Sequence, residues 1–288
     1  MPNVPLFVSK QSRRRIPRIY GWSMIRRDEI GPEQNKSWLL IPQIEHARLS
    51  GLLAKHWVAS TSGPLEPRNE LIDAIDHHDD GWAAWDRRPD CDPHSGRPLE
   101  FTKMPLAESL GIWQQSIEMA AARGDLQAYV VSGHFSALLR GAAPRWQASK
   151  FGSTLATEFL GEQDQRRAEW LESWIGTAPD RHSPEIAERG LAWLRFFDGL
   201  SLWFCCAARH QPQVFDPPDG RSLAITPIQE TGGQFTAAPW PLDVTELEWS
   251  VPARRIAVAH YADRAALREA GGEGVAVPFR LISPTASL

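Results

Sequence analysis

The sequence predicts a mainly α-helical protein, a helical bundle with a small antiparallel β region from the C-terminal end packed on it. Apolar residues recur at helical spacing in successive segments between residues 43 and 208, with Gly and Pro between them. After residue 210 these segments give way to short apolar runs bounded by Gly and Pro, which are typical of strands. With 42% hydrophobic and 23% charged residues, the composition is that of an ordinary globular protein.

The expected elements follow the chain in this order. Residues 1–34 form a partly irregular N-terminal leader that includes a basic cluster at 13–15 and a short strand at 21–30. Helices are expected at 43–58, 68–85, 105–123, 126–139, 152–174 and 184–208, with a long loop at 86–103. Strands are expected at 222–229, 234–237, 246–251, 256–261 and 277–283, with a short helix at 264–270.

These elements divide the chain into a metal-binding helical domain, residues 35–211, and a β-rich subdomain, residues 212–288. We expect the subdomain to pack on the helical body rather than to fold independently, and a strand from the N-terminal segment could join it.

Charge and cysteine content restrict the class of function. The formal net charge of −4 gives no reason to expect binding to nucleic acid or to an anionic membrane. The three cysteines, Cys91, Cys205 and Cys206, leave one thiol unpaired in any disulfide scheme, which favours the reducing cytoplasm. The apolar stretch 191–208 contains two charged residues, so we interpret it as a buried helix rather than a membrane span.

An apolar stretch in the second helix carries polar residues that point into the core. On a helix, Leu71, Ile75 and His78 share one face and Asp79 lies beside them, whereas His77 falls on the polar flank. A buried carboxylate must be paired, protonated or bound to a cation, because an isolated buried charge is strongly unfavourable.

Three further polar residues share this inward position. His46, His134 and Asp198 lie on the apolar faces of other expected helices. Each histidine alone is explained by a hydrogen-bonded core residue, but imidazole and carboxylate together suit a divalent transition metal. We therefore expect one ion of Fe, Mn, Zn, Co or Ni, held by His46, His78, Asp79 and Asp198.

The order of these residues resembles the HD-domain superfamily, in which an early histidine, a His-Asp doublet and a late aspartate bind metal. His46 matches the early histidine, His78 and Asp79 the doublet, which Asp80 and Gly81 follow, and Asp198 the late aspartate. Over roughly residues 35–285 the chain resembles the bacterial domain-of-unknown-function family 3891 more closely. The matching segments are 42–51, 77–82, 96–101, 131–134, 197–202 and 239–242.

The superfamily resemblance implies an HD-domain-like helical bundle with metal-dependent phosphohydrolase chemistry. We therefore expect a hydrolase that attacks a phosphate ester with a metal-activated water. In this hypothesis His134 is a further ligand or an acid–base catalyst, and Asp80 orients a ligand. Arg97, and with it Arg87 or Arg88, would bind a phosphoryl oxygen. The expected partner is a small-molecule substrate that could be phosphorylated, not a nucleic acid or a membrane.

Two alternatives remain open. The resemblance also implies a smaller branch of di-iron oxygenases, which needs a second additional histidine, and His182 on a Pro-flanked loop is the candidate. Because only His134 is a convincing helical candidate, the sequence favours one metal. The other alternative is a non-catalytic helical module with a structural metal, which a site sealed from solvent would favour.

Overall fold

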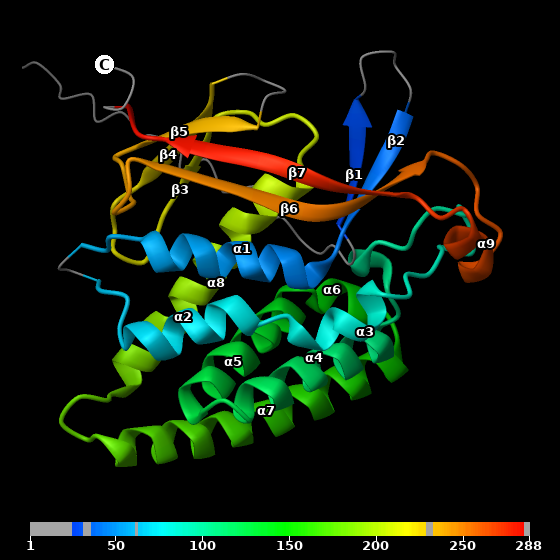
Figure 1. Ribbon diagram of the computed structural model, residues 1–288. Helices are drawn as coiled ribbons and strands as arrows, with labels where there is room; N and C mark the ends of the chain where they lie inside the picture. The colour runs from blue at the N-terminus through cyan, green and yellow to red at the C-terminus, as the bar shows by residue number, and fades with distance from the viewer. Residues whose placement is uncertain (1–24, 31–35, 61–62, 229–232, 285–288) are drawn as a thin grey trace, which may run out of the picture.

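A curled sheet of seven strands and several layers of helices make up the described part of the chain (Figure 1). This computed structural model describes residues 25–30, 36–60, 63–228 and 233–284, so the basic cluster at 13–15 and most of the predicted leader lie outside it. Helices account for 52% of the protein. The predicted fold class, a mainly helical bundle with a small β region, is therefore wrong.

The sheet joins strands from both ends of the chain in the order β1-β2-β6-β7-β5-β4-β3. Its strands are β1 (Ile25–Ile30), β2 (Lys36–Ile41), β3 (Gln213–Phe215), β4 (Leu223–Pro227), β5 (Gln234–Ala238), β6 (Glu246–Ala257) and β7 (Glu273–Ile282). The pairing of β5 with β7 is parallel, whereas the other pairs are antiparallel. The sheet is therefore mixed, not antiparallel as predicted.

Two strands explain why the sheet is larger than predicted. Burial alternates along all of β6, although the proline at position 252 led to a prediction of two short strands. Strand β2 pairs only with residues 254–257 of β6. Residue 252 therefore lies beyond the end of β2, on the edge of β6 that faces β2, and the missing N–H of Pro252 breaks no pairing on this edge. The unpredicted strand β2 has four consecutive buried residues, 38–41, because both of its faces are covered.

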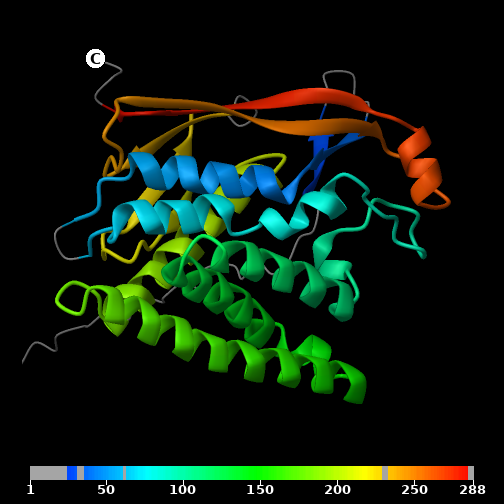
Figure 2. The same cartoon turned by 60° about the horizontal axis from the view of Figure 1, so that its bottom comes forward.

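The helices lie in layers below the sheet. They are α1 (Gln43–His56), α2 (Arg68–His77), α3 (Ala83–Asp86), α4 (Leu106–Ala121), α5 (Asp125–Gly141), α6 (Ala143–Trp146), α7 (Lys150–Thr177), α8 (Pro184–Cys206) and α9 (Arg264–Glu269), with 3-10 turns η1 (Asp80–Trp82) and η2 (Phe101–Lys103). Helix α1 lies directly beneath the sheet, α2 and α5 lie further from it, and α7 is outermost (Figure 2).

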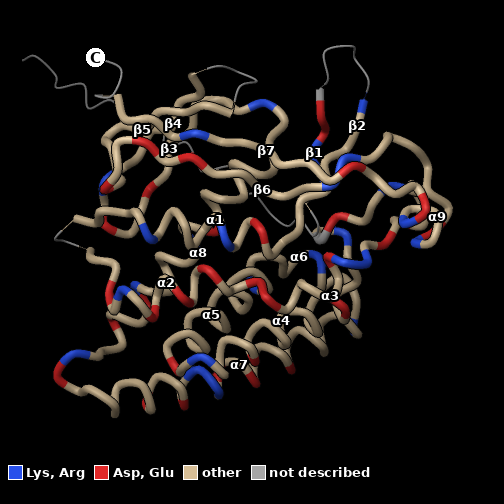
Figure 3. The backbone as a smooth tube through the Cα atoms, in the orientation of Figure 1, with Lys and Arg blue, Asp and Glu red and all other residues tan. Residues whose placement is uncertain are grey.

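Burial follows this layering. Helix α8 packs against α1 and α5, and many of its residues are buried. Most of α7 is exposed and carries acidic and basic side chains (Figure 3). Among the described residues, no helix combines the length and apolar character needed to cross a membrane.

The helix predicted at 68–85 is interrupted, and the interruption positions the His-Asp doublet. Helix α2 ends at His77, and Asp79 has φ −109° and ψ 19°, outside the helical region. Gly81 follows, and its N–H donates to Ser116 Oγ on α4 at 3.0 Å. A Cβ at Gly81 would lie 2.5 Å from the carbonyl oxygen of Ile112, so only glycine allows this close approach. The turn directs Asp79 toward His46 on α1.

Candidate metal centre

Four helical segments bring the five inward residues of the sequence together. His46 comes from α1, His78 and Asp79 from the end of α2, His134 from α5 and Asp198 from α8. They form two groups that share His78: one with His46 and Asp79, the other with His134 and Asp198. Within each group the potential ligand atoms lie within 4.8 Å of one another.

The ring of His46 is oriented by a chain of serine hydroxyls. Its Nδ1 lies 3.0 Å from Ser201 Oγ, and that hydroxyl donates to the Asp198 carbonyl oxygen at 3.0 Å. The Ser201 hydroxyl therefore connects the His46 ring to the backbone of α8 and fixes the direction of the ring. The other nitrogen, Nε2, lies 2.8 Å from Asp79 Oδ2.

The ring of His78 is held in a similar way. Its Nδ1 donates to the carbonyl oxygen of Ile75 at 2.7 Å. Its Nε2 is buried without a hydrogen-bond partner, 3.4 Å from Asp198 Oδ1 and 3.7 Å from Asp79 Oδ2. Two imidazole nitrogens and two carboxylates thus converge in a buried space, and each nitrogen can donate an electron pair to a cation once it has released its proton.

This donor set strongly favours a positive charge. Burial alone would lower the pKa of His78, but the nearby carboxylates of Asp79 and Asp198 outweigh it and raise this pKa to about 9. Burial would likewise raise the pKa of Asp198, but His134 and His78 hold it well below its usual range. A metal ion would take the place of the proton on His78.

His134 is a neutral neighbour of this charged group. Burial lowers the pKa of its ring to about 4, and its Nδ1 is buried without a hydrogen-bond partner. The ring lies edge to face with His78, with 5.4 Å between the ring centres. This position suits a further ligand or a base at neutral pH.

A cavity of about 760 Å³ opens onto the cluster. His46, Asp79, His134 and Asp198 line it, and the Asp198 side chain is 14% exposed whereas that of His78 is fully buried. The two carboxylates can therefore be reached through the cavity, while His78 is held behind them.

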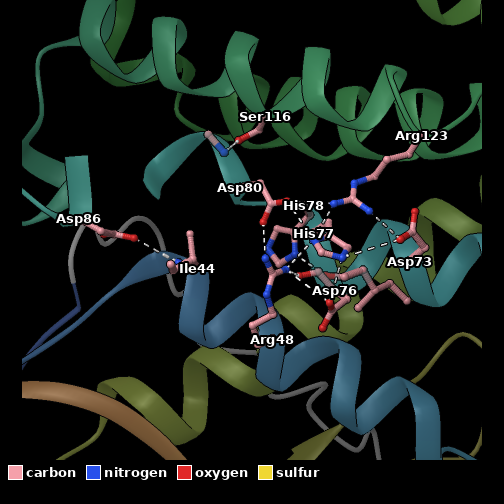
Figure 4. A network of polar contacts seen from close by, with 12 residues as sticks. Ile44, Arg48, Asp73, Asp76, His77, His78, Asp80, Asp86, Ser116 and Arg123 are labelled. Carbon is pink, nitrogen blue, oxygen red and sulfur yellow. Dashed lines mark hydrogen bonds and ion pairs between the residues drawn. The ribbon is translucent and has the colours of Figure 1, made fainter. Parts of the chain in front are cut away.

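Asp80, in η1, lies in a separate polar network with Arg48, His77 and Arg123 (Figure 4). Arg48 Nη2 donates to its Oδ1 at 2.7 Å, and His77 Nδ1 lies 2.8 Å from its Oδ2. Arg123 Nη2 approaches the same Oδ2 at 3.5 Å. No metal-ligand group found among the described residues includes Asp80, so its proposed role in orienting a ligand stays a prediction.

The predicted phosphate-binding arginines also lie elsewhere. Arg97 is exposed and does not line the cavity at the cluster. Arg87 and Arg88 line a different pocket of about 250 Å³, beside α9. The alternative ligand His182 stacks on Trp174 with 3.9 Å between ring centres, at the end of α7. The structure does not bring these four residues to the cluster.

Sequence reasoning missed the residues that orient the ligands. Ser50, four residues after His46, also donates to Ser201, with 2.8 Å between the hydroxyl oxygens. Ser201 itself lies three residues after Asp198. These helical spacings placed both serines on the inward faces, so the same periodicity could have identified them.

The comparisons with known proteins identify a family but no activity. The family model described as "Protein of unknown function (DUF3891)" matches residues 25–257. No curated protein and no solved structure matches the chain.

Proposed function

Since the chain belongs to the DUF3891 family, whose description names no reaction, we propose its function from the site: a metal-dependent hydrolase that acts on a phosphate ester. His46, His78, Asp79 and Asp198 would hold one divalent transition metal. Their order along the chain also supports a relationship of the helical part to HD-domain proteins.

One observation carries this proposal. The Nδ1 atoms of His46 and His78 contact Ser201 and a backbone carbonyl, so both Nε2 atoms are directed toward Asp79 and Asp198. Two buried carboxylates this close together need a positive charge beside them, which protons on the imidazoles supply in the free protein and a metal ion would supply in their place. Imidazole nitrogen and carboxylate oxygen are suitable ligands for Zn, Fe, Mn, Co or Ni.

A divalent ion bound here supplies Lewis acidity, which lowers the pKa of water and offsets negative charge on a phosphoryl group. His134 is neutral at pH 7, and its unpartnered Nδ1 can accept a proton from the attacking water. Lys103 and Arg145 line the same cavity and add the positive charge that an anionic ester needs. In this proposal they replace Arg97 and Arg87 as the basic residues near the substrate.

The cavity supports a catalytic role over a purely structural metal, because structural sites are closed to solvent whereas Asp79 and Asp198 line an open space. The position of His182 against Trp174 gives no support to a second iron site that uses this residue.

The first test is metal analysis of protein expressed without a histidine tag. We expect close to one metal per chain in the native protein and in His182→Ala, the matched histidine control. His78→Gln should lose the metal, since this side chain is shared by both groups of ligand atoms. Equal metal contents in His78→Gln and the native protein would contradict the assigned site.

The second test is hydrolysis of phosphomonoesters and phosphodiesters by protein loaded with Mn, Fe or Ni. We expect activity that His78→Gln abolishes and His182→Ala retains. If His182→Ala loses metal and activity as well, the two-metal alternative replaces the one proposed.

A further inference from the structure

We propose that the substrate is an amphiphilic phosphate ester whose large apolar group occupies the cavity beside the metal centre. This inference rests on the proposed function and deepens it by naming the substrate class. The phosphate would lie at the metal that Asp79 and Asp198 hold, and the apolar group would extend along the cavity toward Phe151.

The cavity is walled by aromatic and aliphatic side chains. Trp113 stacks on Phe135 with 5.3 Å between ring centres, and Phe135 lies next to His134. The other apolar side chains of the wall are Trp82, Met104, Leu106, Leu138, Leu139, Trp146 and Leu202. A volume of about 760 Å³ is within the range of pockets for sizeable ligands.

Several polar groups of the wall already have partners within the protein. Trp146 Nε1 donates to the Leu139 carbonyl oxygen at 2.8 Å, which leaves the indole ring as apolar surface. Ser149 Oγ accepts from Gly152 N–H at 3.0 Å, and one guanidinium nitrogen of Arg145 donates to a backbone carbonyl at 2.9 Å. Because most of the lining side chains are apolar, a nucleobase or sugar along this wall would lose hydrogen bonds to water that these side chains do not replace. A hydrocarbon group loses none, and this difference favours an apolar ligand.

An exposed aromatic residue extends this apolar surface outward. Phe151, in the first turn of α7, lines the cavity and is 71% exposed, the largest exposure among the large hydrophobic residues of the described chain. In this proposal the exposed ring of Phe151 contacts the outer part of the bound apolar group.

The test measures binding of alkylphosphonates of increasing length, from methyl to octyl, to the Mn-loaded full-length protein by calorimetry. Phosphonates carry a C–P bond that a phosphoesterase does not hydrolyse, so binding is measured without turnover. We expect affinity to rise about fourfold for each added methylene until the cavity is filled, as burial of hydrocarbon predicts. Inorganic phosphate and a nucleoside monophosphate should bind more weakly than octylphosphonate.

A variant of the exposed aromatic residue tests the direction of the chain. Phe151→Ser should reduce the gain in affinity for the longest chains and leave the short ones unchanged. Val214→Ser is the matched control, because this 52% exposed residue lies on β3 and does not line the cavity. It should bind every phosphonate as the native protein does.

Hydrolysis of methyl and octyl phosphate, measured in parallel, separates the two proposals. If the esters are hydrolysed but phosphonate affinity does not depend on chain length, or the nucleotide binds more tightly than octylphosphonate, the proposed apolar substrate is wrong and the proposed hydrolase activity is retained. A rise in affinity with chain length without hydrolysis of any ester overturns the hydrolase and supports an apolar ligand in the cavity.

Discussion

Replacing Asp86 by asparagine should remove a pH dependence of stability that arises at the start of α1. Asp86 Oδ2 accepts from the N–H of Ile44 at 3.2 Å and thereby caps a helix whose own N-cap residue, Pro42, offers no side-chain hydrogen bond (Figure 4). Its Oδ1 is buried without a partner. Burial raises the pKa of this carboxyl from 3.8 to about 7, although hydrogen bonds from the α1 backbone oppose the shift.

The sign and size of the effect follow from proton linkage. Between pH 4 and 7 the folded chain holds a proton on Asp86 that the unfolded chain releases, so the free energy of unfolding falls as pH rises. The full pKa difference corresponds to about 4 kcal/mol at 1.36 kcal/mol per unit, and about 3 kcal/mol of it falls between pH 5 and 8. An asparagine side chain in this place would keep an acceptor oxygen for the N–H of Ile44 and would not titrate.

Urea denaturation followed by tryptophan fluorescence, with a chelator present, measures this effect. The stability of Asp86→Asn relative to the native protein should increase by about 3 kcal/mol from pH 5 to pH 8. Asp92→Asn is a control, because hydrogen bonds from the N–H groups of His94 and Ser95 lower the pKa of Asp92. Its linkage therefore lies below pH 5, and the stability of this variant relative to the native protein should not change between pH 5 and pH 8. A stability difference for Asp86→Asn that is the same at both pH values would refute the reasoning.

Three other substitutions test the candidate site and its surroundings. Gly81→Ala should destabilise the fold by about 1–3 kcal/mol because its Cβ would meet the backbone of α4. Gly111→Ala is the control, since a Cβ there meets nothing within 4 Å. Equal melting temperatures of the two variants would contradict this prediction. Arg48→Ala should lower the free energy of unfolding in urea by about 1–3 kcal/mol, since Asp80 loses a charged partner. The metal content should be unchanged, and a loss of metal would show that this network supports the metal site. Mn at one hundred times its Kd should stabilise the native protein by about 2.7 kcal/mol and leave the melting temperature of His78→Gln unaltered, and a shift in both proteins would argue against the assigned ligand.

The helices and the inward polar residues could be predicted because their signals are local. The spacing of apolar residues around His46, His134 and Asp198 indicates one face of a helix, and the structure buries the two histidines and points the partly exposed Asp198 into the cluster. The interruption after His77 could not be predicted in this way, since it depends on the close approach of α4 to Gly81.

The extent of the sheet depends on contacts between distant segments. Residues 36–41 carry no alternating pattern, because α9 and neighbouring side chains cover the face of β2 that a sheet of this kind usually exposes. The pairing of β2 with β6 joins segments about two hundred residues apart, and no local pattern specifies that partner.

The sequence by itself determined that His46, His134 and Asp198 lie on the inward faces of their helices, and it led to the hypothesis of a metal site. Only the tertiary structure decided which of the polar residues meet. Asp79 and Asp80 are adjacent in the chain, yet the turn at Gly81 directs Asp79 toward His46 and leaves Asp80 with Arg48. Periodicity specifies the direction of a side chain relative to its own helix, whereas the packing of helices on one another and on the sheet sets what lies in that direction.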